Sequence, residues 1–241
     1  MKRLFLSLVG FLVVISVQAQ HLNGAWRLIE EDGKKVNQET IKLYSNSFFT
    51  YATYDSSSGN FIEAGGGTYF YEFFNYTETV EIDSNEPALS GTKRSYKALL
   101  DDNVLTLTNL KDGKVRVWEK FDEADDYEMT TCWRIHKKRD QGDEDWRKIV
   151  YSPRKTLKML TNNRYQVLAF NSSTGEFIGS SGGTWNKEPR LYQENIEFFS
   201  KNSSNVGRNL EFNRKMDDGL WHHTGNQTDG DLMMEVWLRY K

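Results

Sequence analysis

The sequence predicts an all-β protein built from two tandem antiparallel up-and-down β-barrels of about eight strands each. The first observation is composition: 241 residues contain only 3 prolines but 18 glycines and 14% aromatic residues, which favours strands joined by tight turns. The second is that apolar and polar residues alternate over short segments bounded by turn clusters. The third is that a long stretch of the chain is written twice, which predicts two copies of one fold.

The repeat divides the chain into two units. At a fixed offset, residues 42–108 align with residues 158–224 without a gap, and 19 of the aligned pairs are identical. The flanking segments repeat as well, with length changes confined to loops. Because turn glycines and strand positions recur, the structure itself is expected to be duplicated. We therefore expect one barrel over residues 20–122 and another over 131–241, joined by an acidic linker at 123–130.

The first 19 residues have the pattern of a secretory signal peptide. Lys2 and Arg3 precede an apolar run from Leu4 to Val17, and small residues at Val17 and Ala19 mark a cleavage site. We expect an exported protein, periplasmic or secreted, with no membrane span in the mature chain. Without the leader, 29 basic residues face 34 acidic ones. This balance argues against nucleic acid or anionic lipid as the main partner.

Eight strands are expected in sequence order within the first copy. They lie around Trp26 and at residues 47–54, 60–63, 68–72, 76–82, 92–100, 104–108 and 115–121. Turn clusters such as Asp55–Gly59 and Leu110–Lys114 separate them, and the glycine runs before Tyr69 and Trp185 also read as turns. Closure of such a sheet removes its edges and leaves a bore that just holds a small ligand.

A resemblance to a known group rests on the ends and middle of each copy. Gly24-Ala25-Trp26, the consecutive hairpins and the basic residue beside a Trp on the last strand resemble the lipocalin and fatty-acid-binding (calycin) superfamily. Gly-Thr-Tyr/Trp followed by Tyr-x-Glu and a terminal Val-Trp-x-Arg/Lys is similar to lipocalin-like secreted bacterial proteins. The resemblance implies a lipocalin-like fold in both copies and leaves the ligand open.

The same resemblance implies a cation-π contact at the base of each barrel. Lys120 would lie across Trp26, and Arg239 across Trp133. Both contacts would serve barrel closure. Thr131 stands at the position of the glycine in the Gly-x-Trp pattern. The base of the second barrel is therefore expected to close differently from that of the first.

Alternation along the strands turns a glutamate into each bore. The apolar parity of residues 76–82 carries four side chains inward, namely Tyr76, Glu78, Val80 and Ile82, and their equivalents are Tyr192, Glu194, Ile196 and Phe198. A buried carboxylate needs a cation or a raised pKa. Folding the next hairpin about Ser204 places Arg214 opposite Glu194. In the first copy the matching position is Ala98, and the inward arginine, Arg94, lies about four residues away.

Aromatic residues share the inward parity and complete the expected ligand-binding set. The set comprises Tyr51, Tyr69, Tyr76, Glu78, Arg94 and Tyr96 in the first copy, and Tyr165, Trp185, Tyr192, Glu194, Arg214 and His223 in the second. His222 and His223 are adjacent on a strand and face opposite ways, so they cannot chelate one metal ion from inside. We expect no metal and no cofactor.

These features favour a non-enzymatic exported protein that binds a small apolar or aromatic ligand with a polar end. One alternative is a lipocalin-fold enzyme, a lyase or isomerase acting on a phenolic or unsaturated acid through a buried glutamate. The other is a ligand-free envelope interaction module whose bores are filled by their own side chains.

Overall fold

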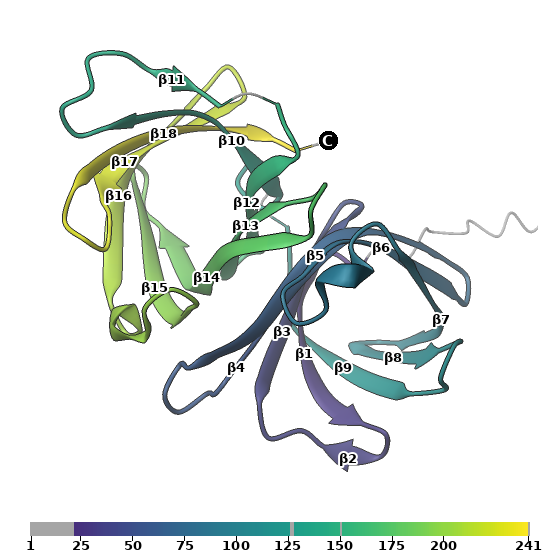
Figure 1. The fold of residues 1–241 in the computed structure, drawn as a ribbon. Coiled ribbons are helices and arrows are strands. Elements are labelled where there is room, and N and C mark those ends of the chain that lie inside the picture. The colour runs from purple at the N-terminus through teal and green to yellow at the C-terminus, as the bar shows by residue number, and fades with distance from the viewer. Residues whose placement is uncertain (1–21, 126–127, 150, 241) are drawn as a thin grey trace, which may run out of the picture.

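The computed structural model describes residues 22–125, 128–149 and 151–240, so the expected signal peptide lies outside the described residues. The described chain forms two closed antiparallel barrels of eight strands, one after the other, each with one additional two-residue strand (Figure 1). The predicted fold class is therefore confirmed, and the two barrels fit a lipocalin-like fold. None of the described helices is long and apolar enough to cross a membrane.

Each barrel is a meander in which neighbours in sequence are neighbours in the sheet. The first barrel contains β1 (Gly24–Glu31), β3 (Glu39–Ser45), β4 (Phe48–Tyr54), β5 (Phe61–Glu72), β6 (Asn75–Asp83), β7 (Lys93–Asp101), β8 (Val104–Asn109) and β9 (Val115–Asp122), with the short β2 (Lys34–Lys35) beside β1 and a 3₁₀ turn, η1 (Pro87–Leu89), before β7. β9 pairs back with β1 and closes the barrel.

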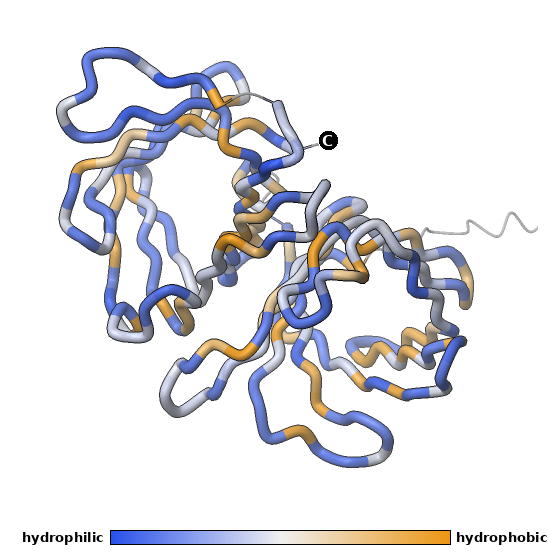
Figure 2. The backbone as a smooth tube through the Cα atoms, in the orientation of Figure 1, coloured by the Kyte–Doolittle hydropathy of each residue, from blue (hydrophilic) through white to orange (hydrophobic). Residues whose placement is uncertain are grey.

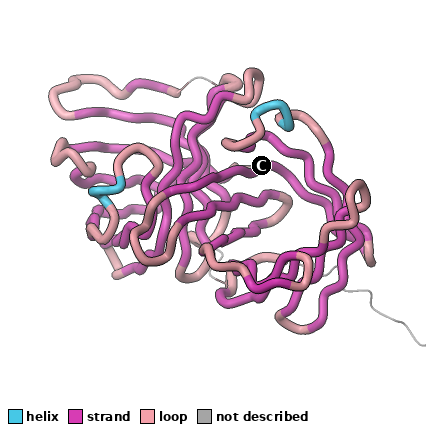
Figure 3. The backbone as a smooth tube through the Cα atoms, turned by 60° about the horizontal axis from the view of Figure 1, so that its bottom comes forward, coloured by secondary structure: helices cyan, strands magenta, loops and turns pink. Residues whose placement is uncertain are grey.

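The second barrel repeats this order. It contains β10 (Cys132–Asp140), β12 (Arg154–Leu160), β13 (Arg164–Asn171), β14 (Glu176–Lys187), β15 (Leu191–Phe199), β16 (Asn209–Asp217), β17 (Leu220–Asn226) and β18 (Leu232–Arg239), with β11 (Arg147–Lys148) beside β10 and η2 (Ser203–Asn205) before β16. Pairing of β18 with β10 closes it. Figure 3 shows both closed sheets and the two short helical turns in one view.

Two strand predictions are wrong: one strand was missed and one was predicted as two. The predicted number of strands per barrel is therefore still correct. The segment Glu39–Ser45 is a strand that the sequence analysis did not assign. The two predicted strands 60–63 and 68–72 are one twelve-residue strand, β5, that runs straight through Gly65, Gly66 and Gly67. A Cβ on Gly67 would lie 2.1 Å from the Thr79 carbonyl oxygen. Glycine is therefore required here for close approach of two strands and not for a turn.

A β-bulge beside these glycines redirects the end of β6. Gly66 pairs with Ile82 and Gly67 with Val80, so Glu81 is an extra residue on β6. An extra residue reverses the alternation beyond it. Ile82 consequently faces the other barrel, and Phe198 does the same after the equivalent bulge in β15. The prediction that both point inward is wrong for this reason.

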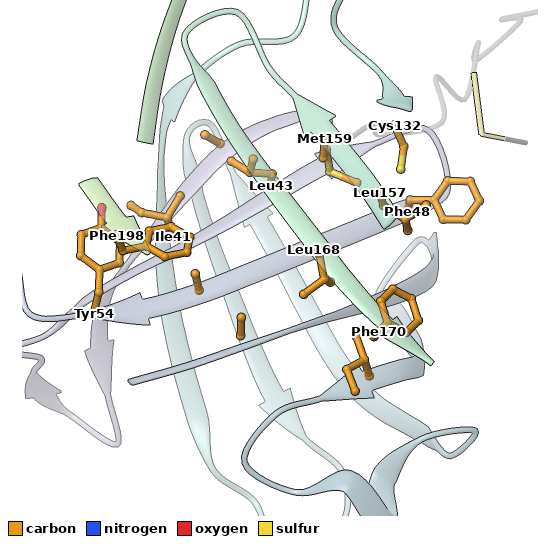
Figure 4. Packing of buried hydrophobic residues seen from close by; sticks show 14 residues of the cluster. Ile41, Leu43, Phe48, Tyr54, Cys132, Leu157, Met159, Leu168, Phe170 and Phe198 are labelled. Atoms are coloured by element: carbon orange, nitrogen blue, oxygen red, sulfur yellow. The ribbon is translucent and has the colours of Figure 1, made fainter. Parts of the chain in front are cut away.

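The two barrels pack against each other through one apolar cluster. It lies on the outer faces of β3 and β4 and of β12 and β13, joined by the redirected ends of β6 and β15 (Figure 4). The buried members are Ala25, Ile41, Leu43, Phe48, Ala52, Tyr54, Ala64, Ile82, Cys132, Leu157, Met159, Leu168, Phe170 and Phe198. Hydrophobic burial therefore has three centres, one inside each barrel and one between them. Figure 2 shows apolar positions recurring along the strands that meet there.

Equivalent residues of the two copies meet across this contact. The rings of Phe61 and Phe177 stack with centroids 5.6 Å apart and an interplanar angle of 3°. The Phe48 ring of the first barrel packs on Tyr240 of the second, with centroids 4.6 Å apart. In the reverse direction Arg164, the equivalent of Phe48, lies 5.7 Å from the ring of Phe121, the equivalent of Tyr240. A patch that meets its own copy in this reciprocal way has the geometry of a two-fold dimer interface.

The base of each barrel closes in the same way. Trp26 Nε1 donates a 2.8 Å hydrogen bond to the carbonyl of Leu22, and Trp133 Nε1 donates one of equal length to Met129. Lys120 Nζ lies 6.0 Å from the Trp26 ring centroid, and the Arg239 guanidinium lies 5.2 Å from that of Trp133. Both implied cation-π contacts are confirmed. With Thr131 in place of glycine the second base keeps both tryptophan contacts, although its strand pairing ends at Trp133 with Arg239, whereas that of the first base continues across a bulge to Ala25 with Asp122.

Candidate functional site

A buried lysine satisfies the inward glutamate of the first barrel. Lys42 Nζ donates to Glu78 Oε1, and Tyr76 Oη donates to the same oxygen at 2.8 Å. Tyr44 Oη lies 2.9 Å from Tyr76 Oη and, since Tyr76 donates to Glu78, supplies the proton of that bond. All four side chains are buried. The expectation that Glu78 points inward is confirmed, but its cation comes from β3.

The second barrel repeats the arrangement with one change. Lys158 Nζ donates to Glu194 Oε1 at 2.8 Å, and Tyr192 Oη donates to it at 2.9 Å. Leu160 occupies the position of Tyr44, so the chain of hydroxyl groups is one member shorter. Both barrels therefore bury one ion pair with one phenol donor.

The predicted pairing of Arg214 with Glu194 is wrong. Glu194 lies opposite Leu210 in the ladder, while Arg214 lies opposite His223 and contacts Glu128 at 3.4 Å. The hairpin turns about a point two residues earlier than predicted, and a displaced turn shifts the facing residue by twice that amount. Arg94 is directly opposite Glu78 in the ladder of the first barrel.

Aromatic rings surround each buried ammonium. Lys42 Nζ lies 4.5 Å from the Phe49 ring centroid and 5.4 Å from that of Trp118. Lys158 Nζ lies 5.1 Å from the Trp237 ring and 5.2 Å from the Trp221 ring. Burial lowers the pKa of Lys42, although the charge and hydrogen bond of Glu78 oppose that shift. Ring faces and a carboxylate together offset the loss of hydration.

Most of the other predicted aromatic residues form the packed interior. Tyr69 and Tyr96 lie 5.9 and 5.7 Å from the Tyr76 ring, and Trp185 donates from Nε1 to the Thr161 carbonyl at 2.9 Å. Tyr165 is buried in the corresponding layer of the second barrel. These side chains face inward as predicted and pack within the bores, and Tyr96 lies toward the end of its bore that is remote from Leu22.

The middle layers of both bores leave no surface that a water molecule could reach. Tyr76, Ala98, Leu105, Tyr192 and Trp221 all have zero exposed area. Two open hollows have volumes of about 480 and 470 Å³. One is lined by Asp125, Asn162, Asn163, Trp185, Asn186 and Lys187, and the other by Asn60, Phe61, Phe199, Ser200, Lys201, Asn202 and Ser203.

Charged and phenolic groups gather at the end of the first barrel that is remote from Leu22. Tyr51 Oη donates to Asp83 Oδ2 at 3.0 Å, and Arg94 donates to the same oxygen at 2.7 Å. Arg116 stands one inward position beyond Trp118 on β9 and bonds Glu31 at 2.8 Å, with both side chains about 40% exposed. We call the inward-facing group Tyr51, Glu63, Asp83, Arg94, Tyr96 and Arg116 the polar mouth.

Glu63 is the least satisfied carboxylate of the polar mouth. Its Oε1 accepts a 3.2 Å hydrogen bond from Thr53 Oγ1. Burial and the charge of Asp83 raise the pKa of Glu63. Arg94 and Arg116 both have raised pKa values, because bonds to Asp83 and Glu31 outweigh the effect of burial. The mouth therefore combines two permanent cations with a carboxyl group that gains a proton more readily than usual.

The second barrel lacks this mouth. The residues equivalent to Tyr51, Glu63, Asp83 and Arg94 are Val167, Gly179, Phe199 and Leu210. Val167 and Leu210 pack against the apolar interior instead. The repeat therefore keeps the buried ion pair and replaces these four mouth residues with apolar ones, while the buried Glu235 stands at the position of Arg116.

The second bore contains a histidine where the first has a leucine. His223 faces inward and is 1% exposed, as predicted, and it replaces Leu107. Its Nδ1 lies 3.5 Å from Glu235 Oε2, too far for a strong hydrogen bond. Neither ring nitrogen has a hydrogen-bond partner within the described chain, and Tyr165 Oη and Trp221 Nε1 share this condition. Burial, followed by the charge of Lys158, lowers the pKa of His223.

No protein-family model matches the chain, and no curated protein is similar to it at a significant level. Among the residues described, no group of three or more histidine, cysteine, aspartate or glutamate side chains could hold a metal ion.

Proposed function

We propose that the chain is an exported binding protein whose first barrel holds a small apolar or aromatic molecule with a polar end at the polar mouth. The second barrel supports the first through their shared apolar contact. Residues 1–19 would direct export and be removed, as their sequence pattern suggests.

The observation that carries this proposal is the difference between the two mouths. A barrel of this sequence type closes without a polar mouth, since the second barrel has Val167 and Leu210 at the positions of Tyr51 and Arg94. Partly buried charges lose hydration, and pairing offsets that cost only in part, as for Arg94 with Asp83 and Arg116 with Glu31. Folding alone therefore does not account for the polar mouth, whereas ligand binding does.

The chemistry of the mouth fits a ligand with one polar end. Arg94 and Arg116 supply fixed donors, and Glu63 can accept a hydrogen bond or, once protonated, donate one. The rings of Tyr51 and Tyr96 offer apolar faces beside these groups. Sites that join a few convergent polar groups to aromatic walls are typical of small-molecule binding. The ligand would lie above the packed middle layer and not inside it.

An interaction module without a ligand is the second candidate. It is favoured by the filled middle layers, because an enclosed ligand would have to displace buried aromatic rings. An enzyme that uses Glu78 as its acid or base has less support. That carboxylate already accepts from Lys42 and Tyr76, and no water-reachable space adjoins Tyr76.

A thermal-shift screen tests the proposal. Fatty acids, bile acids and phenolic acids are added one by one to the exported protein and to the Arg94→Leu variant, which installs the residue of the second barrel. Lys93→Leu is the matched control, because Lys93 precedes Arg94 on β7 and is exposed. We expect at least one ligand to raise the melting temperature of the native protein and of Lys93→Leu. The same ligand should bind Arg94→Leu at least tenfold more weakly.

Two outcomes would overturn the proposal. One is the absence of any shift across the panel, which would favour the interaction module. The other is a ligand that binds Arg94→Leu as tightly as the native protein, which would place the site elsewhere.

A further inference from the structure

The hairpin between β5 and β6 presents three phenylalanine side chains to solvent. Phe70, Phe73 and Phe74 are 63%, 64% and 60% exposed, although phenylalanine is normally among the more buried residues. Phe73 and Phe74 form the two-residue turn itself, between the paired Glu72 and Asn75. We call Phe70, Phe73 and Phe74 the phenylalanine tip.

Phe73 also adopts a backbone conformation that disfavours it. Its φ is +56°, in the left-handed region. The other non-glycine residues with positive φ in the described chain are all aspartate or asparagine, namely Asp32, Asn46, Asp102 and Asp218, which tolerate this region well. A bulky aromatic at such a position is an outlier, and retained local strain points to function.

The second copy does not keep the phenylalanine tip. Its equivalents are Asn186, Pro189 and Arg190, all exposed and polar or turn-forming. The hairpin closes in both copies. The aromatic residues are therefore not required for the turn or for the barrel.

We propose that the phenylalanine tip inserts into the interfacial region of a lipid bilayer and docks the protein on a membrane surface. This function is separate from ligand binding at the polar mouth and does not depend on it. The bound state needs no change of fold, since the rings already point into solvent.

The size of the tip favours a bilayer over a protein partner. Three phenylalanines with about 200 Å² each, at the exposed fractions above, present roughly 370 Å² of apolar surface. A stable protein interface buries about 800 Å² on each partner. Exposed polar residues flank the tip, since Glu72 and Asn75 adjoin it and Lys97 lies opposite Asn75. The exposed Leu99, next to Ala98 whose backbone bonds Phe74, adds apolar surface beside it. A small apolar tip within a polar rim matches the boundary between acyl chains and headgroups.

The position of the tip in the barrel allows such docking. Leu22, the first described residue, lies within hydrogen-bonding reach of Tyr69, which directly precedes Phe70. The tip therefore belongs to the base end of the first barrel, and in Figure 1 the β5–β6 hairpin extends away from the second barrel. The polar mouth is at the opposite end and stays open to solvent in a docked protein.

Flotation with vesicles tests the proposal. The exported protein, whose amino terminus is checked by mass spectrometry, is mixed with phosphatidylcholine vesicles and centrifuged through a density gradient. The test variant combines Phe73→Asn with Phe74→Ser, and asparagine suits the positive φ, so the hairpin should fold. Leu110→Ser is the matched control, because Leu110 is 65% exposed and belongs to a different hairpin. Any contribution from a retained leader would be common to all three proteins.

We expect the native protein and Leu110→Ser to float with the vesicles, and the double variant to remain at least tenfold less bound. The proposal is overturned if the native protein stays at the bottom of the gradient, or if the double variant floats equally well. Analytical ultracentrifugation adds a second readout. A native dimer that the double variant cannot form would assign the tip to a second copy of the chain and would also overturn membrane docking.

Discussion

The two barrels share one set of structural residues, called here the shared frame, and differ at other positions. Both keep the buried lysine, glutamate and tyrosine, the glycine-assisted bulge and the tryptophan at the base. They differ at the mouth, at the β5–β6 tip and in the bore, where Leu107 in one corresponds to His223 in the other. What is shared is required for closure, because two diverged copies both retain it. What differs is free of that requirement and is where function is to be sought.

The largest expected effect concerns the shared frame. Lys42→Met leaves Glu78 buried without its cation, and Lys158→Met does the same to Glu194. Removal of one partner of a buried pair costs about 3–5 kcal/mol, because the remaining charge is uncompensated. We expect losses of this size in both barrels, measured by urea unfolding. The double variant Lys42→Met/Glu78→Gln should recover much of the loss.

A loss below about 1 kcal/mol for Lys42→Met alone would contradict the role given to the ion pair. A large loss of unfolding free energy for one of Lys42→Met and Lys158→Met, with a negligible loss for the other, would show that the buried ion pair stabilises only one of the two barrels.

The next largest effect is a pH dependence of stability that His223 gives to the second bore and that the first bore, with Leu107, lacks. The pKa of His223 is lowered by burial from its ordinary value of 6.5. Below that value the unfolded chain binds a proton that the folded chain does not bind, so stability falls as the pH falls, by up to about 1.4 kcal/mol per pH unit. Lys158 adds to the lowering, while Glu235 and Glu194 oppose it.

His223→Leu, which installs the residue of the first barrel, should remove this part of the pH dependence between pH 7 and 5. Its effect at pH 7 should be small, since the closest polar contact of the ring, Nδ1 to Glu235 Oε2 at 3.5 Å, is long. His222→Thr is the control, because His222 is the neighbouring, more exposed residue. Melting curves that keep the native pH dependence in His223→Leu would refute the assignment.

The smallest effect concerns the phenylalanine tip. Phe73→Asn relieves the left-handed strain and should stabilise the protein by about 1 kcal/mol, read as a rise in melting temperature. The equivalent turn of the second barrel, residues 188–190, contains no residue with positive φ. Arg190→Asn should therefore have little effect on stability. A fall in stability for Phe73→Asn would mean that the exposed ring supports the fold.

The sequence was sufficient for the fold but not for the partner of Glu78. Duplication and alternation can be read from the residues alone, so they predicted two barrels and the inward tyrosine and glutamate. The strand Glu39–Ser45 was not assigned, and Lys42 was lost with it. One signal was present: Lys42 and Lys158 are identical in the repeat and alternate with apolar neighbours such as Ile41 and Leu43.

The other errors have non-local causes. The register of the hairpin before β16 depends on where its turn is centred, and the composition of residues 200–208 does not fix that point. The inward or outward facing of Ile82 depends on a bulge, which arises from close packing of β5 against β6. The polar mouth emerged from comparing the two folded copies position by position, since only the fold tells which aligned residues share a layer.

The central claim is that one barrel of the two binds ligand, and the stoichiometry of binding tests it most directly. Native mass spectrometry of the purified protein, with the compound that gives the largest thermal shift, counts bound molecules per chain. We expect one molecule per chain, lost in Arg94→Leu and retained in Lys93→Leu. Two molecules per chain, or one that persists in Arg94→Leu, would contradict it.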